Sequence, residues 1–420
     1  MATINSAGPM DDEPPRIGFA AMQHRDFFLL FIGKNCGFMA LHAVLVAVAY
    51  QVYDITGNVL NLAWIGLATF APAIGFALFT GYVADRYDRR LVIAICSASI
   101  MFASLLFMFV SFSGMKQVWP VFAILIILGT GRAFYQPASN SFVPNLVPKI
   151  ELPNAIAWYT SANKICQTVG PALGGIIYGL SGPEVVYAGA AVLLGIGTIS
   201  FLFIRTKNPR ATPERPTLHN LLAGLRYVME KKIVLGAISL DLFVVLLGGV
   251  TALFPVYAKD ILNVGPEGAG LLRSAFAFGA LLTGLALTRI AMQKDVGKIL
   301  YVSVVIFGVA TMVFGISEVF WLSLLAMFVV GAADMVSVNI RVSLIQLATP
   351  DDMRGRVNAV NSVFTGASNE IGEFRAGSMA ALIGAVPAVL IGGVGSIAVA
   401  AFFWRAFPQL AKVQRMDRDL

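Results

Sequence analysis

Charged residues are scarce in this sequence. Asp, Glu, Lys and Arg make up 13% of its 420 residues, whereas 58% of the residues are hydrophobic. A soluble domain carries about twice that share of charge, and no polar stretch here is long enough to fold as a separate soluble domain. The composition therefore excludes a soluble protein and an appended soluble enzyme or receptor module. It indicates a chain that crosses the membrane several times.

Cysteine is also scarce, and so are the motifs of enzyme chemistry. Cys36, Cys96 and Cys166 lie far apart in apolar segments, which excludes a disulfide framework or a metal-ligand spacing and favours small core residues. The sequence has no phosphate-binding Gly-x-x-x-x-Gly-Lys-Ser/Thr loop and no Gly-x-Ser-x-Gly elbow. We therefore expect no enzyme activity, no cofactor and no metal, and any transport would be driven by a gradient rather than by ATP.

Apolar segments, by contrast, are abundant, and spanning a membrane needs roughly 20 residues in each. Twelve such segments occur, at 27–50, 58–80, 91–112, 119–143, 155–180, 184–204, 233–257, 268–290, 298–317, 319–346, 356–383 and 385–407. Six lie on each side of one long polar connection. The pattern predicts an all-α membrane protein with twelve transmembrane helices in two six-helix bundles.

The polar connection divides the chain into parts. We expect an N-terminal tail, a first bundle, a linker, a second bundle and a C-terminal tail, at 1–26, 27–204, 205–232, 233–407 and 408–420. The linker is rich in proline up to Pro216, and from Leu218 to Val228 its apolar residues recur at helical spacing. This spacing predicts an amphipathic helix that lies on the cytoplasmic membrane surface.

The placement of Lys and Arg predicts the orientation. With an even number of helices both termini lie on one side, and the loops of that side carry 22 Lys and Arg, against Lys116 and Lys259 on the other. Basic loops face the cytoplasm, so both termini are expected there, in a cell or inner membrane. The same bias accounts for the formal net charge of +7, which therefore gives no reason to expect a nucleic-acid partner.

The two predicted bundles share a sequence repeat. Six pairs of identical residues recur at one constant offset of 202 positions, namely Trp119 and Trp321, Gly129 and Gly331, Ser141 and Ser343, Pro148 and Pro350, Gly170 and Gly372, and Gly175 and Gly377. Glycine matches are common by chance, but tryptophan and proline matches are not. A repeat of this kind indicates duplicated, pseudo-symmetric halves, as many transporters have.

A dense run of charge from Gly81 to Arg90 separates two apolar segments, so it must form a short aqueous loop. Its spacing, Gly-x-x-x-Asp-Arg-x-x-Arg-Arg, resembles the loop between helices two and three of the major facilitator superfamily of transporters. The resemblance implies a cytoplasmic latch between the two halves, formed by Gly81, Asp85, Arg86, Arg89 and Arg90. A basic loop that only sets topology is the alternative.

A second motif lies in the fifth predicted span. Gly170-Pro171-Ala172-Leu173-Gly174-Gly175 is similar to the Gly-Pro-x-x-Gly-Gly motif in helix five of proton-coupled exporters of this superfamily, although Cys166 replaces the glycine expected four residues earlier. Proline removes one backbone hydrogen bond and glycine permits close contact. Gly170, Pro171, Gly174 and Gly175 are therefore expected to form a bendable segment, with plain helix packing as the alternative.

Charged side chains within the spans are costly in lipid unless they are paired or face water. The candidates for proton coupling are Arg132, Asp241, Asp334, Glu370, Glu373 and Arg375. Glu370 and Glu373 are three residues apart and share a helix face, and neighbouring carboxylates favour proton uptake. The superfamily's helix-four motif implies a coupling role for Arg132. Asp334, its repeat equivalent, could face it across the pseudo-two-fold axis. Structural ion pairs, gate residues or solvated acids remain the alternatives.

Uncharged polar groups in the spans either hold helices together or line a cavity. The cavity candidates are Asn35, His42, Gln136, Asn163, Gln167 and Asn339. For His42 a packing role is the alternative. The long side chains of Lys34, Lys164 and Arg273 are expected to reach the membrane surface or to pair with the acids, and contact with a ligand is the alternative.

The run from Pro350 to Ala359, together with the helix-five motif, resembles the twelve-helix drug and siderophore exporters related to the enterobactin exporter. The resemblance implies two bundles that rock around a midplane site and export a small amphipathic molecule against inward proton movement. An uncoupled facilitator or importer of a small organic solute is the alternative. The expected partners are a small-molecule substrate, protons and the lipid bilayer, and a monomer suffices for a site between two halves of one chain.

Overall fold

The computed structural model describes residues 18–76, 79–80, 83, 86–114, 117–206, 218–289 and 294–414, with the side chains of 149, 218–223 and 351–352 left aside. Helices account for most of these residues, and no strand occurs within the described ranges. The all-α architecture predicted from the apolar segments is therefore confirmed.

The N-terminal half contains six long helices. They are α1 (Arg25–Thr56), α2 (Val59–Gly75), α4 (Arg89–Phe112), α5 (Trp119–Phe142), α6 (Leu152–Ser181) and α7 (Pro183–Leu202), with short 3-10 helices η1 (Ala21–Gln23), η2 (Val143–Asn145) and η3 (Lys149–Glu151). Helix α1 packs against α6 and α7, and α4 packs against α5 and α7.

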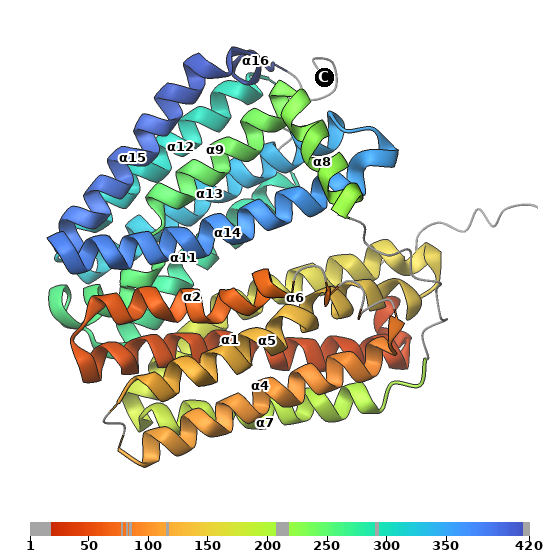
Figure 1. Cartoon of the computed structure of the whole chain (residues 1–420), viewed down its shortest axis with the longest axis vertical. Helices are drawn as coiled ribbons and strands as arrows, with labels where there is room; N and C mark the ends of the chain where they lie inside the picture. The colour runs from red at the N-terminus through yellow and green to blue at the C-terminus, as the bar shows by residue number, and fades with distance from the viewer. Residues whose placement is uncertain are drawn as a thin grey trace, which may run out of the picture.

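The C-terminal half repeats this plan with α9 (Lys232–Gly248), α11 (Gly265–Leu287), α12 (Val296–Ile316), α13 (Phe320–Leu347), α14 (Asp351–Ile383) and α15 (Ala385–Ala406), and ends on α16 (Pro408–Ala411). Helix α9 packs against α14 and α15, and α12 packs against α13 and α15. Because equivalent pairs of helices meet in both halves, the twelve long helices named here form two pseudo-symmetric bundles, drawn one above the other in Figure 1.

The repeat is visible in backbone detail. Gly182 and Gly384, which are 202 residues apart, both join two long helices with a positive φ, at 85° and 93°. A Cβ on Gly129 would overlap the carbonyl of Thr69 in α2, and one on Gly331 would overlap the carbonyl of Phe276 in α11. The same close helix crossings therefore occur in both halves, as the sequence repeat predicts.

The helices differ in how well they suit lipid. Within the described residues, nine helices are long and apolar enough to cross a membrane. Helix α2 is apolar but only 17 residues long, whereas α6 and α14 have 30 and 33 residues but carry many polar side chains. A helix that faces lipid must be apolar, and one that faces an internal aqueous surface need not be. Helices α6 and α14 are thus the expected walls of an internal site.

One predicted span is interrupted. The apolar segment 233–257 predicts a continuous helix, but α9 ends at Gly248 and is followed by η4 (Thr251–Leu253), the short α10 (Phe254–Val256) and the π-helix η5 (Tyr257–Ile261). Gly248 and Gly249 are adjacent, and glycine is a poor helix former. Hydropathy is insensitive to such a break, because the broken segment is as apolar as the helix before it.

The linker helix α8 (Leu218–Glu230) packs against α14 and α9. A Cβ on Gly224 would lie 2.8 Å from the carbonyl oxygen of Arg356 in α14. The hydroxyl of Tyr227 donates to the carbonyl oxygen of Ala348 at 2.7 Å, and Val228 is buried among apolar side chains of α9 and α14. The described side chains therefore attach α8 to the C-terminal half, and its place on the membrane surface stays a prediction.

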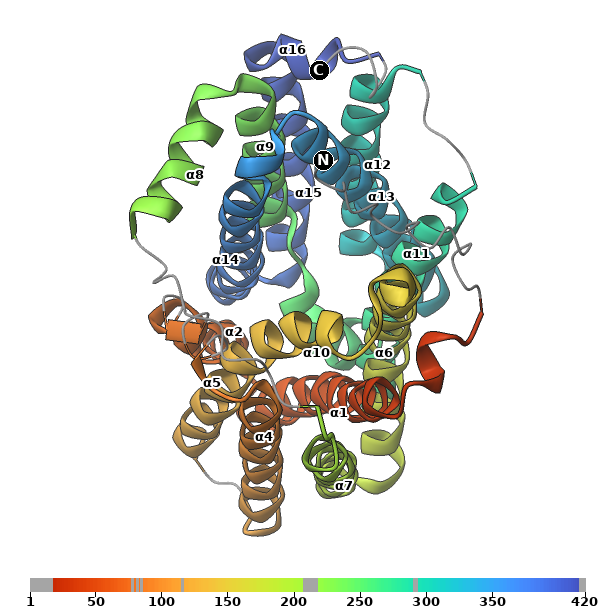
Figure 2. The same cartoon turned by 90° about the vertical axis from the view of Figure 1, so that its right-hand side faces the viewer.

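We call the end of the molecule at which α1 and α9 begin and α7 ends the linker end, and the opposite end the far end. In Figure 1 the linker end, with α8, lies at the right, and Figure 2 looks at the molecule from that side. The two halves diverge toward the linker end and approach each other at the far end.

Candidate functional site

A cavity of about 750 Å³ lies between the two halves. Its lining residues come from α1, α2, α5 and α6 on one side and from α9, η4, α11, α12, α13 and α14 on the other. Figure 2 shows the arrangement of the two halves from the linker end. The charged and most polar side chains that line it are His42, Arg132, Gln136, Lys164, Gln167, Thr251, Arg273, Asp334, Asn369, Glu370 and Glu373. A neighbouring pocket of about 190 Å³ shares many of these residues. The volume of the larger cavity, about 750 Å³, suits a drug-sized ligand.

Polar contacts join the two halves at the far end. Lys259 of η5 forms an ion pair with Asp54 at the end of α1, with 2.5 Å between Nζ and Oδ1. The neighbouring residues also interact, since the hydroxyl of Tyr53 donates a short hydrogen bond to Asp260. Two adjacent residues of α1 therefore hold two adjacent residues of η5.

Close backbone approach also joins the halves there. A Cβ on Gly175 of α6 would lie 3.0 Å from the Cα of Gly270 in α11, and one on Gly377 of α14 would lie 2.9 Å from the Cβ of Ala63 in α2. These two contacts are equivalent under the repeat. They bring α6 against α11 and α14 against α2, on opposite sides of the molecule.

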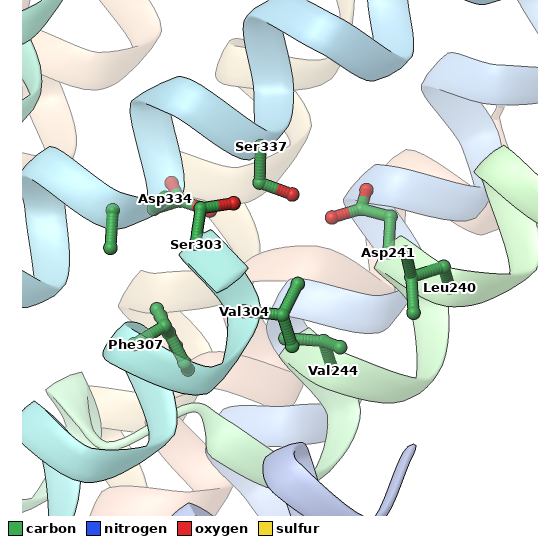
Figure 3. Close-up of a pocket in the computed structure, with 9 residues that line it drawn as sticks. Leu240, Asp241, Val244, Ser303, Val304, Phe307, Asp334 and Ser337 are labelled. Carbon is green, nitrogen blue, oxygen red and sulfur yellow. The ribbon is translucent and has the colours of Figure 1, made fainter. Parts of the chain in front are cut away.

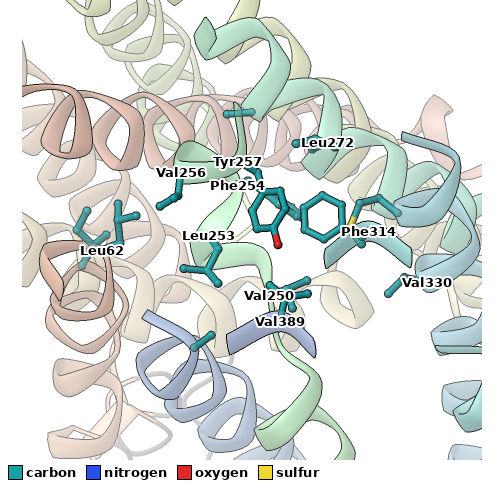
Figure 4. Close-up of a cluster of buried hydrophobic side chains, with 14 of the residues drawn as sticks. Leu62, Val250, Leu253, Phe254, Val256, Tyr257, Leu272, Phe314, Val330 and Val389 are labelled. Carbon is teal, nitrogen blue, oxygen red and sulfur yellow. The ribbon is translucent and has the colours of Figure 1, made fainter. Parts of the chain in front are cut away.

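The irregular segment after α9 fills the far end with apolar side chains. Leu253, Phe254, Val256 and Tyr257 are almost fully buried in one cluster with Leu62 of the N-terminal half, and Figure 4 shows this cluster. The ring of Tyr257 stacks on Phe314 with 4.3 Å between centroids. In this conformation the cavity is thus covered at the far end by η4, α10 and η5.

Glu370 and Glu373 of α14 face the cavity together. Nη1 of Arg132 in α5 lies 3.8 Å from Oε1 of Glu370, and the hydroxyl of Thr251 in η4 donates to Oε1 of Glu373 at 2.5 Å. A Cβ on Gly66 of α2 would lie 3.4 Å from Oε2 of Glu370 and 3.8 Å from Oε2 of Glu373. The two acids therefore stand where α14 meets the N-terminal half, and Glu370, not Asp334, is the partner of Arg132.

Arg375 lies on the same helix but has a different environment. Its Nε donates to the carbonyl oxygen of Leu246 at 2.7 Å, and its Nη2 donates a short hydrogen bond to that of Leu247. Both carbonyls belong to the last turn of α9, where no helical amide remains to bind them. Arg375 therefore caps the interrupted helix, next to the contact between Thr251 and Glu373.

Asp241 of α9 is buried and paired. Its Oδ1 lies 2.7 Å from Nη2 of Arg341 in α13, and the hydroxyl of Thr365 in α14 donates to Oδ2 at 3.2 Å. Figure 3 shows Asp241 with Asp334 and Ser337 around a small pocket of about 10 Å³ between α9, α12 and α13. Asp334 lines both this pocket and the large cavity. It is the one candidate acid shared by the two spaces within the described residues.

Arg341 and Thr251 belong to the site but were not among the residues predicted from the sequence. Arg341 lies near the end of the predicted span 319–346, where a cation is easily assigned to the adjoining loop. The signal that could have identified it is Asp241, a lone acid in span seven that needs a buried partner. Thr251 carried no signal, because its role depends on the break in α9.

The uncharged cavity candidates fall into two groups. His42, Gln136 and Gln167 line the cavity, and Nζ of Lys164 donates to Oε1 of Gln167 at 3.4 Å. Among the described residues, neither ring nitrogen of His42 has a hydrogen-bond partner, although both are buried.

The other three candidates lie elsewhere. Asn35 donates to the carbonyl oxygen of Phe31 in its own helix at 2.7 Å and contacts Cys166 of α6. Asn163 of α6 has a buried Oδ1 without a partner in the described part of the chain, and Asn339 is half-buried in α13.

The described members of the predicted latch are Arg86, Arg89 and Arg90, whereas its other two residues, Gly81 and Asp85, lie outside the described residues. Nη1 of Arg89 donates to the carbonyl oxygen of Ser141 at 2.7 Å, and Nη1 of Arg90 donates to that of Ile204 at 2.9 Å. Ser141 lies in the last turn of α5, and Ile204 lies two residues beyond the end of α7. Arg89 and Arg90 thus bind the start of α4 to its own half.

The helix-five motif, formed by Gly170, Pro171, Gly174 and Gly175, lies in α6, which continues as one helix through Pro171. A Cβ on Gly174 would lie 2.7 Å from the Cα of Ala43 in α1, and Gly175 faces α11 as described above. The motif therefore lets α6 touch α1 of its own half and α11 of the other half at neighbouring positions.

Sequence comparison places this geometry among known proteins. The family described as transmembrane secretion effector matches residues 17–419. The chain is 22% identical over 406 residues to Macrolide efflux protein A of Streptococcus pyogenes, which covers 93% of this chain and 97% of that protein. It is 25% identical over 390 residues to Enterobactin exporter EntS of Citrobacter koseri, with 90% of each covered.

Structural comparison shows the same fold in distant proteins. A bacterial homologue of the human lysosomal transporter Spinster, in an inward-facing and occupied conformation, is similar with a TM-score of 0.71 at 15% identity, over 93% of this chain and 97% of that one. A D-xylose–proton symporter is similar with a TM-score of 0.69 at 14% identity, over 91% and 97%.

Proposed function

The chain belongs to the transmembrane secretion effector family of the major facilitator superfamily, and on that premise we propose that it is a proton-coupled exporter of a small amphipathic molecule. The resemblance to this superfamily, and to its drug and siderophore exporter branch, is confirmed. The protein is a multi-pass membrane transporter rather than an enzyme.

The proposal places the linker end in the cytoplasm. The distribution of Lys and Arg supports this orientation, because the loops at the linker end carry nearly all of the loop cations. With that orientation, the cavity of this conformation faces the cytoplasm and its far end is covered toward the outside. An exporter collects its substrate in such a state.

The observation that carries the proposal is that three carboxylates face the cavity, on Asp334, Glu370 and Glu373. Glu373 also binds Thr251 at the start of the segment that covers the far end. Protonation of Glu373 removes the charge that holds this hydrogen bond and so weakens it. A proton that arrives from outside and a substrate that arrives from inside would then favour different conformations, as alternating access requires.

One proton is sufficient to drive useful accumulation. A membrane potential of 100 mV contributes about 2.3 kcal/mol per elementary charge. Macrolides and enterobactin, which the names of the two relatives mention, are the first compounds to test. The cavity, of about 750 Å³, lies within the range of drug-sized sites, which is roughly 300 to 1,000 Å³.

The experiment is proton flux in sealed proteoliposomes with an imposed pH gradient, with a radiolabelled macrolide and a catecholate siderophore as probes. We expect one of them to move uphill while protons move in the opposite direction. Substrate movement that is indifferent to the pH gradient would contradict the proposal and favour the uncoupled facilitator.

Glu373→Gln should abolish uphill transport and leave exchange of internal for external substrate. The matched control is Glu230→Gln, since Glu230 is an exposed acid of α8 in an ion pair with Arg226. Uphill transport that survives Glu373→Gln would remove Glu373 from the coupling residues without changing the assignment of the protein as a transporter.

A further inference from the structure

Lys34 of α1 is a buried cation that the mechanism above does not use. Its exposed fraction is 1%, so it does not extend to the membrane surface as its length led us to expect. Its Nζ lies 3.2 Å from the ring centroid of Tyr159 in α6 and 5.2 Å from that of Phe38. Its Nζ donates a hydrogen bond to Oδ1 of Asn140 in α5, at 3.4 Å. Among the described residues, no carboxylate lies within 4 Å of this ammonium group.

The groups around Lys34 are neutral in their ordinary states. The titratable ones are Tyr159 and Cys166 of α6, Tyr135 of α5, whose hydroxyl lies next to Gly37, and Cys36 of α1. Helix α7 contributes Phe201 and Gly197 beside Gly33, and Arg89 at the start of α4 binds the carbonyl after Asn140. Of the groups named here, Arg89 is the charged one, and its charge is positive.

The other half shows how the same position can be neutralised. Lys34 is the ninth residue after Arg25, which begins α1, and Asp241 is the ninth residue after Lys232, which begins α9. At the equivalent position in the C-terminal half, Asp241 has Arg341 as its counter-ion. Arg341 is itself 202 residues after Ser139. In the described residues, this position therefore holds an acid paired with Arg341 in one half, and in the other half the cation Lys34 without a paired carboxylate.

A row of polar side chains connects Lys34 to the cavity. Arg132, Gln136 and Asn140 succeed one another at intervals of four residues along one face of α5. Arg132 and Gln136 line the cavity, and Asn140 is exposed although Lys34 behind it is not. The hydroxyl of Tyr159 also donates to Oδ1 of Asn140, at 2.8 Å. Asn140 therefore has one side toward solvent and the other toward Lys34.

We propose that Lys34 is a second proton-carrying site of the transport cycle, in the N-terminal half, which exchanges its proton through Asn140. The N–H bond of the ammonium group breaks, its electron pair stays on Nζ, and the proton passes to water beside Asn140. The neutral amine suits the enclosed site, because no carboxylate of the described residues pairs with Lys34 there. This inference rests on the proposed proton coupling, and it adds a carrier remote from Glu370 and Glu373.

The first test needs no substrate. Protein labelled with ¹⁵N at the lysine Nζ atoms is titrated in detergent micelles, and the Lys34 resonance is assigned by its loss in Lys34→Met. We expect this resonance to move between the ammonium and the amine positions while the resonances of exposed lysines, such as Lys298, stay at the ammonium position. A Lys34 resonance that remains at the ammonium position while the protein stays folded would overturn the proposal.

The second test measures proton release when the transported probe, the macrolide or the siderophore, binds to detergent-solubilised transporter in weak buffer. Release should fall by about one proton in Lys34→Met and also in Lys34→Arg, because a guanidinium keeps its proton. The matched control is Lys298→Met. Unchanged release in both Lys34 variants would overturn the proposal, whereas absence of release in the wild type would overturn the proposed coupling and leave the first test decisive for Lys34.

Discussion

The first helices of the two halves occupy equivalent places but differ in structure. Helix α1 runs unbroken for 32 residues, whereas α9 stops after 17. Counted from the starts of the two helices, Gly248 and Gly249 correspond to Leu41 and His42. His42 faces Gly170 of α6, and Gly249 faces Gly372 of α14, which are themselves a repeat pair. Duplication has therefore kept the helix crossing and changed the residue that decides whether the helix continues.

The buried charged residues of the two halves also differ in how they are paired. The N-terminal half buries Lys34 against an aromatic ring, while the C-terminal half buries Asp241 with Arg341 and uses Arg375 to bind the end of α9. Helix α9 and its continuation are thus held by side chains of α13 and α14, and α1 is held by its own hydrogen bonds. The comparison indicates a continuous first helix in the N-terminal half and an interrupted one in the C-terminal half.

The largest effect is expected for Arg341→Met. This change leaves Asp241 buried without a counter-ion, which costs about 3 to 5 kcal/mol of unfolding free energy. The measurement is unfolding in detergent, followed by near-ultraviolet circular dichroism. The double variant Asp241→Asn with Arg341→Met removes both charges and should recover most of the loss. Equal losses in the single and double variants would show that Arg341 acts by packing alone.

A smaller effect is expected for Arg375→Met. The carbonyls of Leu246 and Leu247 lose their donors, at a cost of roughly 1 to 3 kcal/mol. The loss should be local, so hydrogen exchange should accelerate in 249–261 and remain unchanged in the last turns of α1. Arg405→Met, at the end of α15, is the matched control. Equal exchange in the two variants would mean that the junction of α9 does not depend on the Arg375 cap.

The smallest effect is expected for Lys259→Gln. The side chains of Lys259 and Asp54 are 36% and 48% exposed, and exposed ion pairs contribute at most about 1 kcal/mol. The far end should nevertheless open more often, which spin labels at Thr56 and Asn263 would detect as a larger population of long distances. High salt should reproduce this shift in the wild type through screening. If the population of long distances changes neither with Lys259→Gln nor with salt, the Lys259–Asp54 ion pair does not help to close the far end.

Much of the fold follows from the sequence, and for physical reasons. Lipid requires long apolar helices, so their order and approximate bounds can be predicted from hydropathy. The constant offset reports duplication because both copies need glycine at the same places, at a positive φ in Gly182 and Gly384 and at a close helix crossing in Gly129 and Gly331. Part of the site can be predicted in the same way. Charges within predicted spans are conspicuous in the sequence, and four of them line the cavity, namely Arg132, Asp334, Glu370 and Glu373.

The interaction partners of those charged residues cannot be predicted from the sequence. That Arg132 meets Glu370 rather than Asp334, that Arg375 caps α9 and that Lys34 has a ring in place of an acid all depend on how helices distant in sequence are rotated against one another. The contacts of α8 also depend on the tertiary structure, because the C-terminal half presents the apolar surface against which Val228 packs.

The sequence by itself therefore determined a duplicated, twelve-span membrane transporter with polar helices around an internal site, because solvation by lipid acts on each segment separately. Only the tertiary structure decided that α1 is continuous and α9 is interrupted, which end of the cavity is covered, and which buried charge has a counter-ion. These properties arise from distances between helices, and the one-dimensional pattern of hydropathy and charge contains no such distances.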